Sequence, residues 1–149
     1  MNDPIKHSAL AAAGLLLAGS SAAVLRAQEA GGAVSDGVYT EVQAERGQVA
    51  YVKYCRTCHA DTMAGIDSAP ALVGGTFLGD WVGQSVSDLA DRIRMTMPLS
   101  NPGTLSSATV SDIISWILKV NGYVAGATEL PRDGQLQQTI RIDAPKRAD

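Results

Sequence analysis

The chain contains, at residues 55–59, the sequence Cys55-Arg56-Thr57-Cys58-His59. Two cysteines separated by two residues and followed at once by histidine form the pattern of covalent c-type haem attachment. From the end of a helix, this spacing lets two thiols reach the two vinyl groups on one haem edge, while the histidine turns beneath the iron. A neutral imidazole is a good axial ligand for iron. The pattern therefore predicts one haem c, attached at Cys55 and Cys58 and bound at its iron by His59.

The N-terminus has the features of an export signal. Lys6 precedes the apolar run 9–18, and small residues follow as far as Ala27. We expect a signal peptide over residues 1–27, with cleavage after Ala27, or alternatively after Ala23, and a periplasmic location. The alternative is an uncleaved anchor, because residues 8–25 approach the length that spans a bilayer, although they are only weakly apolar.

Three other roles are open to the two cysteines. A zinc site needs four ligands, and cleavage would leave two cysteines and His59 as the only histidine, so that Asp or Glu would have to complete the site. A thioredoxin-like redox pair would lie in a βαβ context, and no strand pattern surrounds Cys55. A structural disulfide would give His59 no role. Haem attachment accounts for all three residues together, and we adopt it.

The composition limits the class of protein and its partners. A chain of 149 residues suffices for one domain with one core. The formal net charge is −3, and beyond residue 27 the chain has no basic run, which argues against a nucleic-acid partner. No segment after Arg26 is apolar for long enough to cross a membrane. Aromatic residues make up only 5% of the chain, and a buried haem would add apolar bulk to the core.

Apolar periodicity predicts an all-α domain with long loops. We expect helices over residues 39–54, 84–96 and 109–121, and an irregular loop rich in Gly and Pro over residues 60–79. The expected helix caps are Thr40 for the first helix and Ser85 or Ser87 for the second. Besides its tyrosines, the apolar face of the first helix is expected to consist of Val42, Val49 and Val52.

The boundaries of the domain follow from these elements. Residues 28–38 are small and polar, without an apolar period, and are expected to form a flexible leader. Residues 39–126 form the predicted domain. Residues 127–149, rich in charge, Gln and Pro, are expected to form an extended C-terminal tail along the surface.

Residues 47–126 resemble class I cytochromes c, particularly the small haem proteins and subunits that serve bacterial quinoprotein dehydrogenases. Gly47 and Tyr51 lie eight and four residues before Cys55, where this family places a small and an aromatic residue of its first helix. Trp116 matches the aromatic residue of the last helix that packs against them. The resemblance implies a fold in which few helices and long loops wrap one covalent haem, with two helices crossing closely at Gly47.

The same resemblance implies roles for two further residues. The family's loop in which a proline carbonyl accepts a hydrogen bond from the proximal imidazole is similar to Ala69-Pro70-Ala71-Leu72-Val73-Gly74, which gives that role to Pro70. Trp81 sits where related cytochromes place a tryptophan near the haem propionates. The alternative for Trp81 is an ordinary aromatic residue of the core.

A methionine is expected as the sixth iron ligand. Met63 lies four residues after His59 and is tethered to the same side of the haem. Met95 belongs to the second predicted helix, whereas Pro98 disfavours helical backbone at Met97, so that its thioether can point at a metal. The pair Met97-Pro98 also matches the distal Met-Pro of the family. We assign Met97, with Met95 as the alternative.

These assignments predict an electron carrier with six-coordinate iron and not an enzyme. The expected partners are redox proteins, with a dehydrogenase as donor and an oxidase or another cytochrome as acceptor. The chain would be a free carrier or the cytochrome subunit of a quinoprotein dehydrogenase. The alternative is a five-coordinate haem sensor or a peroxidase-like enzyme, which would need distal acid–base groups. After the expected cleavage, which removes His7, and with His59 assigned to the iron, no histidine remains for that task, and Arg92 and Arg94 are expected as solvated helix charges.

Overall fold

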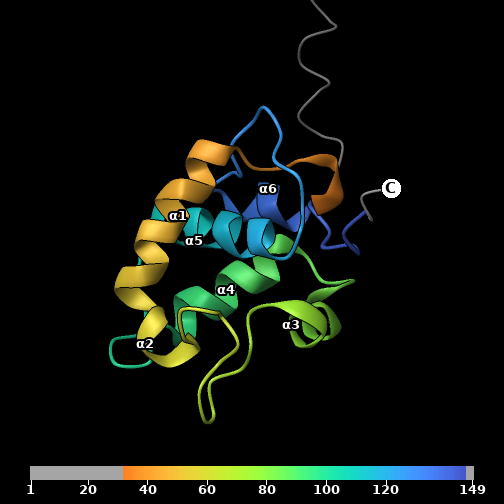
Figure 1. Cartoon of the computed structure of the whole chain (residues 1–149). Helices are drawn as coiled ribbons and strands as arrows, with labels where there is room; N and C mark the ends of the chain where they lie inside the picture. The colour runs from red at the N-terminus through yellow and green to blue at the C-terminus, as the bar shows by residue number, and fades with distance from the viewer. Residues whose placement is uncertain (1–31, 147–149) are drawn as a thin grey trace, which may run out of the picture.

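The computed structural model describes residues 32–146, and within them it contains helices and isolated β-bridges but no strand (Figure 1). In chain order the elements are η2 (Val34–Asp36), α1 (Glu41–Tyr54), α2 (Arg56–His59), α3 (Gly74–Trp81), α4 (Val86–Thr96), α5 (Ser107–Val120) and α6 (Gly134–Gln138). The predicted all-α class is confirmed. The predicted signal over residues 1–27 lies outside the described residues. None of the helices described has both the length and the apolar composition needed to cross a bilayer.

Helices α1 and α5 form the main helix–helix contact of the domain. Helix α1 begins after Thr40, whose hydroxyl accepts a hydrogen bond from the Gln43 amide at 3.2 Å, so the predicted cap is confirmed. The two helices cross at Gly47, and there is no room for a side chain at this position. A β-carbon on Gly47 would lie 1.8 Å from the carbonyl oxygen of Asp112 and 2.9 Å from Cβ of Trp116. The close crossing expected at Gly47 is therefore present.

The predicted apolar face of α1 is wrong in its three valines, whereas Tyr51 of that face is buried. Val42, Val49 and Val52 are 61%, 71% and 46% exposed, and the helix turns a different face to α5. The buried residues of α1 are Gln43, Ala44, Gly47 and Tyr51. Small residues on this face allow the two backbones to approach, which leaves the larger valines on the outer side of the helix.

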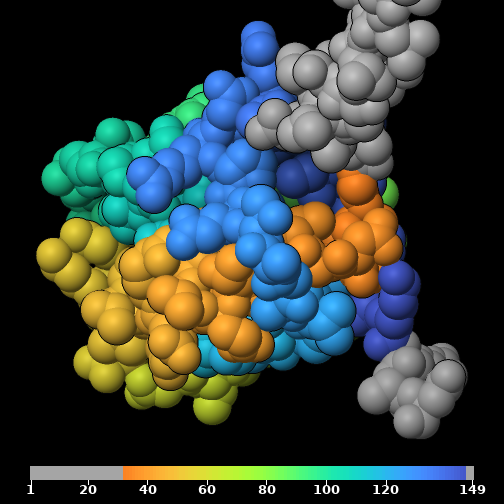
Figure 2. Space-filling view, turned by 90° about the horizontal axis from the view of Figure 1, so that it is seen from above, coloured from red at the N-terminus to blue at the C-terminus, as the bar shows by residue number. Residues whose placement is uncertain are grey.

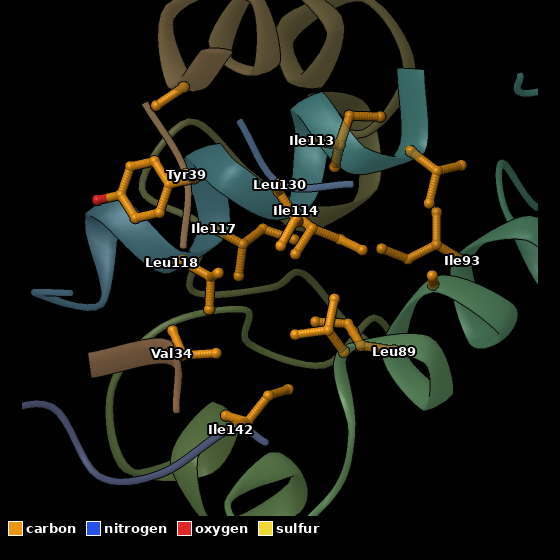
Figure 3. Packing of buried hydrophobic residues seen from close by; sticks show 14 of the residues in the cluster. Val34, Tyr39, Leu89, Ile93, Ile113, Ile114, Ile117, Leu118, Leu130 and Ile142 are labelled. Carbon is orange, nitrogen blue, oxygen red and sulfur yellow. The ribbon is translucent and has the colours of Figure 1, made fainter. Parts of the chain in front are cut away.

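Helices α4 and α5 supply most of the aliphatic core. Helix α4 starts with a capping box in which Ser85 and Asp88 bond to each other's backbone amides. Of the two predicted caps, Ser85 and Ser87, the cap is therefore Ser85. Helix α5 is capped by Ser106, a few residues before its predicted start. Figure 3 shows side chains of both helices meeting residues from the two ends of the domain. The labelled residues of this cluster are Val34, Tyr39, Leu89, Ile93, Ile113, Ile114, Ile117, Leu118, Leu130 and Ile142.

The flexible leader and the surface tail are both wrong for the residues described. Val34 and Ile142 are buried against α4 and α5, and the backbone of residues 140–142 bonds to Gly32 and Val34 on one side and to residues 83–86 on the other. We call residues 127–146 the C-terminal strap. Figure 2 shows the strap crossing α1 and reaching the N-terminal segment. Single apolar residues that fill separate gaps in the core have no period, which is why the pattern did not reveal them.

Buried amide groups hold the strap in place. The Gln43 side chain, which is fully buried, accepts a hydrogen bond from the Leu130 amide at 2.7 Å and donates one to the Leu130 carbonyl at 3.1 Å. Gln137 of α6 donates to Ser111 Oγ of α5 at 3.0 Å and to the Pro131 carbonyl at 2.6 Å. The strap therefore joins the core through specific polar pairs as well as through apolar contacts.

The segment predicted as an irregular loop contains a helix. Helix α3 begins at Gly74, where φ is +70°, and its Phe77 side chain is fully buried. Three of its eight residues are glycines, which weaken helix propensity and hide the helix from pattern analysis. Burial of Phe77 stabilises this helix in the folded protein. Residues 60–73 remain irregular.

Candidate functional site

The site begins where α1 ends. The Cys55 amide donates to the Tyr51 carbonyl at 2.8 Å, which completes the last turn of α1. The Cys55 carbonyl then accepts hydrogen bonds from the amides of Cys58 at 3.2 Å and His59 at 3.0 Å. One short turn thus presents both thiols and the imidazole, as the predicted attachment geometry requires. Both cysteines are free thiols, Cys58 exposed and Cys55 half-buried, and burial raises the pKa of Cys55 to about 11.

His59 is held by the proline carbonyl that the sequence resemblance indicates. The imidazole is 7% exposed, and its Nδ1 lies 2.9 Å from the carbonyl oxygen of Pro70. A carbonyl oxygen can only accept a hydrogen bond, so Nδ1 carries the proton and Nε2 has the free lone pair. This is the tautomer that a metal-binding histidine needs. The predicted hydrogen bond between His59 and Pro70 is confirmed.

The loop between His59 and Pro70 is folded tightly on itself. The Gly65 amide donates to the His59 carbonyl at 3.1 Å, and the Tyr51 hydroxyl donates to the carbonyl of Ala60 at 2.6 Å. Gly65 has φ +80°, and a β-carbon on it would lie 2.2 Å from the Ala69 carbonyl oxygen. Both the backbone conformation and the close contact require glycine there. The loop therefore brings the Pro70 carbonyl back to His59 in a fixed place.

The three methionines beyond the predicted signal occupy different environments. Met63 is buried in the core and 2% exposed. Met95, on the outer side of α4, is 67% exposed. Met97 follows the last residue of α4 with extended backbone, φ −123° and ψ 153°, and its half-buried side chain packs against the core. The extended backbone predicted at Met97 is present, and its role as a ligand stays a prediction.

Trp81 is the last residue of α3. Its side chain is half-buried and packs against the hydrophobic core. This position agrees with either role considered for it, as a neighbour of the propionates or as an aromatic residue of the core.

Residues 42–117 match the family model described as cytochrome c oxidase, cbb3-type, subunit III. The chain belongs to this family of c-type cytochromes. The resemblance to mono-haem class I cytochromes c is thereby confirmed, and with it a covalently bound haem c and electron transfer through its iron. No curated protein matches the sequence.

One solved structure similar to this c-type cytochrome is the sulfane dehydrogenase SoxCD from Paracoccus pantotrophus. The two chains are 22% identical, and the match covers 61% of this chain and 55% of that chain, with a TM-score of 0.43. This chain therefore spans about half the length of the SoxCD chain.

The residues that the structure describes are suited to covalent attachment of the haem that this family binds. The free thiols of Cys55 and Cys58 lie on one turn with His59, whose Nε2 has no hydrogen-bond partner among residues 32–146. In the same part of the chain, no three His, Cys, Asp or Glu side chains gather as metal ligands. The zinc site considered as an alternative would need such a group, whereas covalent haem needs only the residues already on this turn.

Sequence reasoning missed one polar residue of the site. Asn121 follows α5, and its side chain bonds to the backbone of Leu72 and Gly74, in the segment that joins Pro70 to α3. In the sequence, the pair Asn121-Gly122 indicates only the end of a helix. Nothing in the sequence indicates a partner 49 residues away.

Proposed function

We propose that this c-type cytochrome carries single electrons between redox proteins, with His59 and Met97 as axial ligands of a haem attached at Cys55 and Cys58. When bound, the haem iron supplies a one-electron couple between its ferrous and ferric states. The observation that carries the ligand assignment is the hydrogen bond of 2.9 Å between Nδ1 of His59 and the carbonyl of Pro70. This bond orients the ring, fixes its tautomer and makes Nε2 a better donor.

Met97 is the proposed sixth ligand because its position differs from those of the other methionines. It lies just beyond α4 in extended backbone and is half-buried, while Met95 is exposed and Met63 is enclosed in the core. A thioether is a soft ligand that favours ferrous iron, so Met97 would raise the reduction potential relative to a site with two nitrogen ligands. Trp81 is proposed to lie near the haem propionates.

The proposed location is the periplasm, with residues 1–27 as the export signal. The proposed partners are a dehydrogenase that donates electrons and an oxidase or another cytochrome that accepts them. The family description names an oxidase subunit, which supports an oxidase as the acceptor. The sequence resemblance supports a quinoprotein dehydrogenase as donor, either as a separate protein or as a complex that includes this chain.

The proposed ligands are tested by two matched variants. The full chain is expressed in a bacterial strain that exports and matures c-type cytochromes. We expect Met97→Leu to abolish the weak long-wavelength ferric band of the iron–methionine bond, to lower the potential and to open the iron to carbon monoxide. Met95→Leu, an exposed substitution two residues away, should leave all three unchanged.

Two results would contradict the proposal. Loss of the band in Met95→Leu but not in Met97→Leu would reverse the assignment. Binding of carbon monoxide by the wild-type protein would favour the five-coordinate sensor or peroxidase-like alternative. The mass of the mature chain tests the location, because an unprocessed N-terminus would support an anchor.

A further inference from the structure

Asn121 links the end of α5 to the loop that holds His59. Its Nδ2 donates hydrogen bonds to the carbonyls of Ile117 at 2.8 Å and Leu72 at 2.9 Å. Its Oδ1 accepts one from the amide of Gly74 at 2.9 Å. A side-chain amide offers two N–H donors and one carbonyl oxygen, and all of them are engaged here. The residue therefore acts as a three-point clamp that joins the end of α5 to the irregular loop at Leu72 and to the start of α3 at Gly74.

The clamp fixes Leu72 at both of its backbone polar groups. The Leu72 amide donates to the Met63 carbonyl at 2.8 Å, and the Leu72 carbonyl accepts from Asn121. Pro70, two residues earlier, has no N–H with which to anchor itself. The position of the Pro70 carbonyl, 2.9 Å from Nδ1 of His59, therefore depends on the anchoring of its neighbours.

We propose that Asn121 is a positioning residue that sets the strength of the hydrogen bond between His59 and Pro70, an inference that rests on the proposed role of His59 as an iron ligand. A strong bond at Nδ1 makes the imidazole a better electron donor and favours ferric iron. Without the clamp, Leu72 keeps only the bond of its amide to the Met63 carbonyl, so Leu72 and Pro70 are held less firmly and the bond between His59 and Pro70 weakens. The imidazole then donates less, and the reduction potential rises.

Three variants of the haem-loaded full chain separate this role from helix stability. Asn121→Ala removes all three hydrogen bonds. Asn121→Ser keeps a hydroxyl that can bond back to the Ile117 carbonyl four residues earlier, but it is too short to hold the loop as well. Ser106→Ala is the matched control, because it removes a side-chain cap at the opposite end of α5 and the Ser106 side chain makes its hydrogen bonds to Thr109 and not to residues 59–74.

The measurements are the midpoint potential, the exchange rate of the His59 Nδ1 proton in the ferrous protein by NMR, and the thermal midpoint. We expect both Asn121 variants to raise the potential and to speed exchange of the Nδ1 proton by roughly tenfold, the factor that corresponds to the net contribution of one hydrogen bond. Ser106→Ala should lower the thermal midpoint to a similar extent and leave the potential and the proton exchange unchanged.

Several outcomes would overturn the inference. If Ser106→Ala shifts the potential as much as Asn121→Ala, the effect is one of general stability. If neither Asn121 variant changes the Nδ1 exchange while the wild-type protein binds haem through His59, the inference alone fails. If wild-type His59 is not an iron ligand, the proposed function fails, and the inference fails with it.

Discussion

The α-carbon of Gly47 faces the backbone carbonyl of Asp112 so closely that a β-carbon on Gly47 would lie 1.8 Å from its oxygen. The obstacle is backbone in the middle of α5, not a flexible side chain that can turn away. A side chain at residue 47 therefore forces the two helices apart. Because α1 leads directly into the turn that carries Cys55, this crossing also places the candidate site relative to the core.

Replacement of this glycine should destabilise the protein. We expect Gly47→Ala to lower the free energy of unfolding by about 1–3 kcal/mol through overpacking. The control is Gly79→Ala in α3, where no atom lies within 4 Å of the added β-carbon. Gly79→Ala should stabilise the protein by about 0.4–1 kcal/mol, because alanine reduces the entropy of the unfolded chain. Denaturant unfolding measures both, and equal stability of the two variants would contradict the crossing.

The two cysteines should each carry one thioether. Denaturing mass analysis of the exported wild-type protein should show one added haem, whereas the mass of the bare polypeptide would refute covalent attachment. Cys55→Ser and Cys58→Ser should each leave a single thioether, with a shifted pyridine haemochrome band. Thr57→Ala, an exposed substitution between the two cysteines, should retain both bonds and the wild-type spectrum.

The C-terminal strap should depend on Gln43. Gln43→Leu keeps the side-chain size but leaves the buried amide and carbonyl of Leu130 without partners. Each unpaired group is expected to cost about 1–3 kcal/mol of unfolding free energy. Gln48→Leu, on an exposed side of the same helix, is the matched substitution and should change stability little. If the two variants unfold at the same denaturant concentration, the strap is not held by this pair.

Buried tyrosines should make the fold sensitive to alkaline pH. Burial raises the pKa values of Tyr39, Tyr51 and Tyr123 from the usual 10.0 to about 12. In this interval the native state keeps protons that the unfolded chain has lost, so stability is fully present below pH 10 and falls as pH rises toward 12. The denaturant concentration at the unfolding midpoint should decline as the pH rises across this interval. The decline should be less steep in Tyr39→Phe, which has one buried hydroxyl group fewer. A flat profile would contradict burial of these hydroxyl groups in the native state.

The predictability of this fold depended on whether a residue's partner was close in sequence. Thr40 and Ser85 cap helices through amides three residues away; the cap at Thr40 was predicted, and Ser85 was one of the two caps predicted for its helix. The spacing of Cys55, Cys58 and His59 is equally local, and it directed attention to the right turn. The proline that holds His59 was predicted only through a family resemblance, since a carbonyl group has no signature of its own.

Residues with distant partners were not predictable in this way. Gln43 pairs with Leu130 over 87 residues, and nothing in the sequence distinguishes it from the exposed Gln48 of the same helix. The valines of α1 misled the analysis because burial there was decided by the approach of two backbones and not by apolar content. Gly47, and not the three valines, decides which face of α1 is buried, because α5 approaches the helix at Gly47.

The pairing of the two ends of the domain has a practical consequence for attaching this protein to other materials. Residues 32–36 and 140–146 lie together, and Lys146 forms an ion pair with Asp36 at 3.0 Å. Both segments lie at the end of the molecule remote from α2 (Figure 1). A cytochrome immobilised on an electrode through residues 32–36 or 140–146 would therefore turn its His59 side outward. Such a film would leave the side of the molecule that carries Cys55, Cys58 and His59 accessible to a dissolved donor, whichever of the two segments is used for coupling.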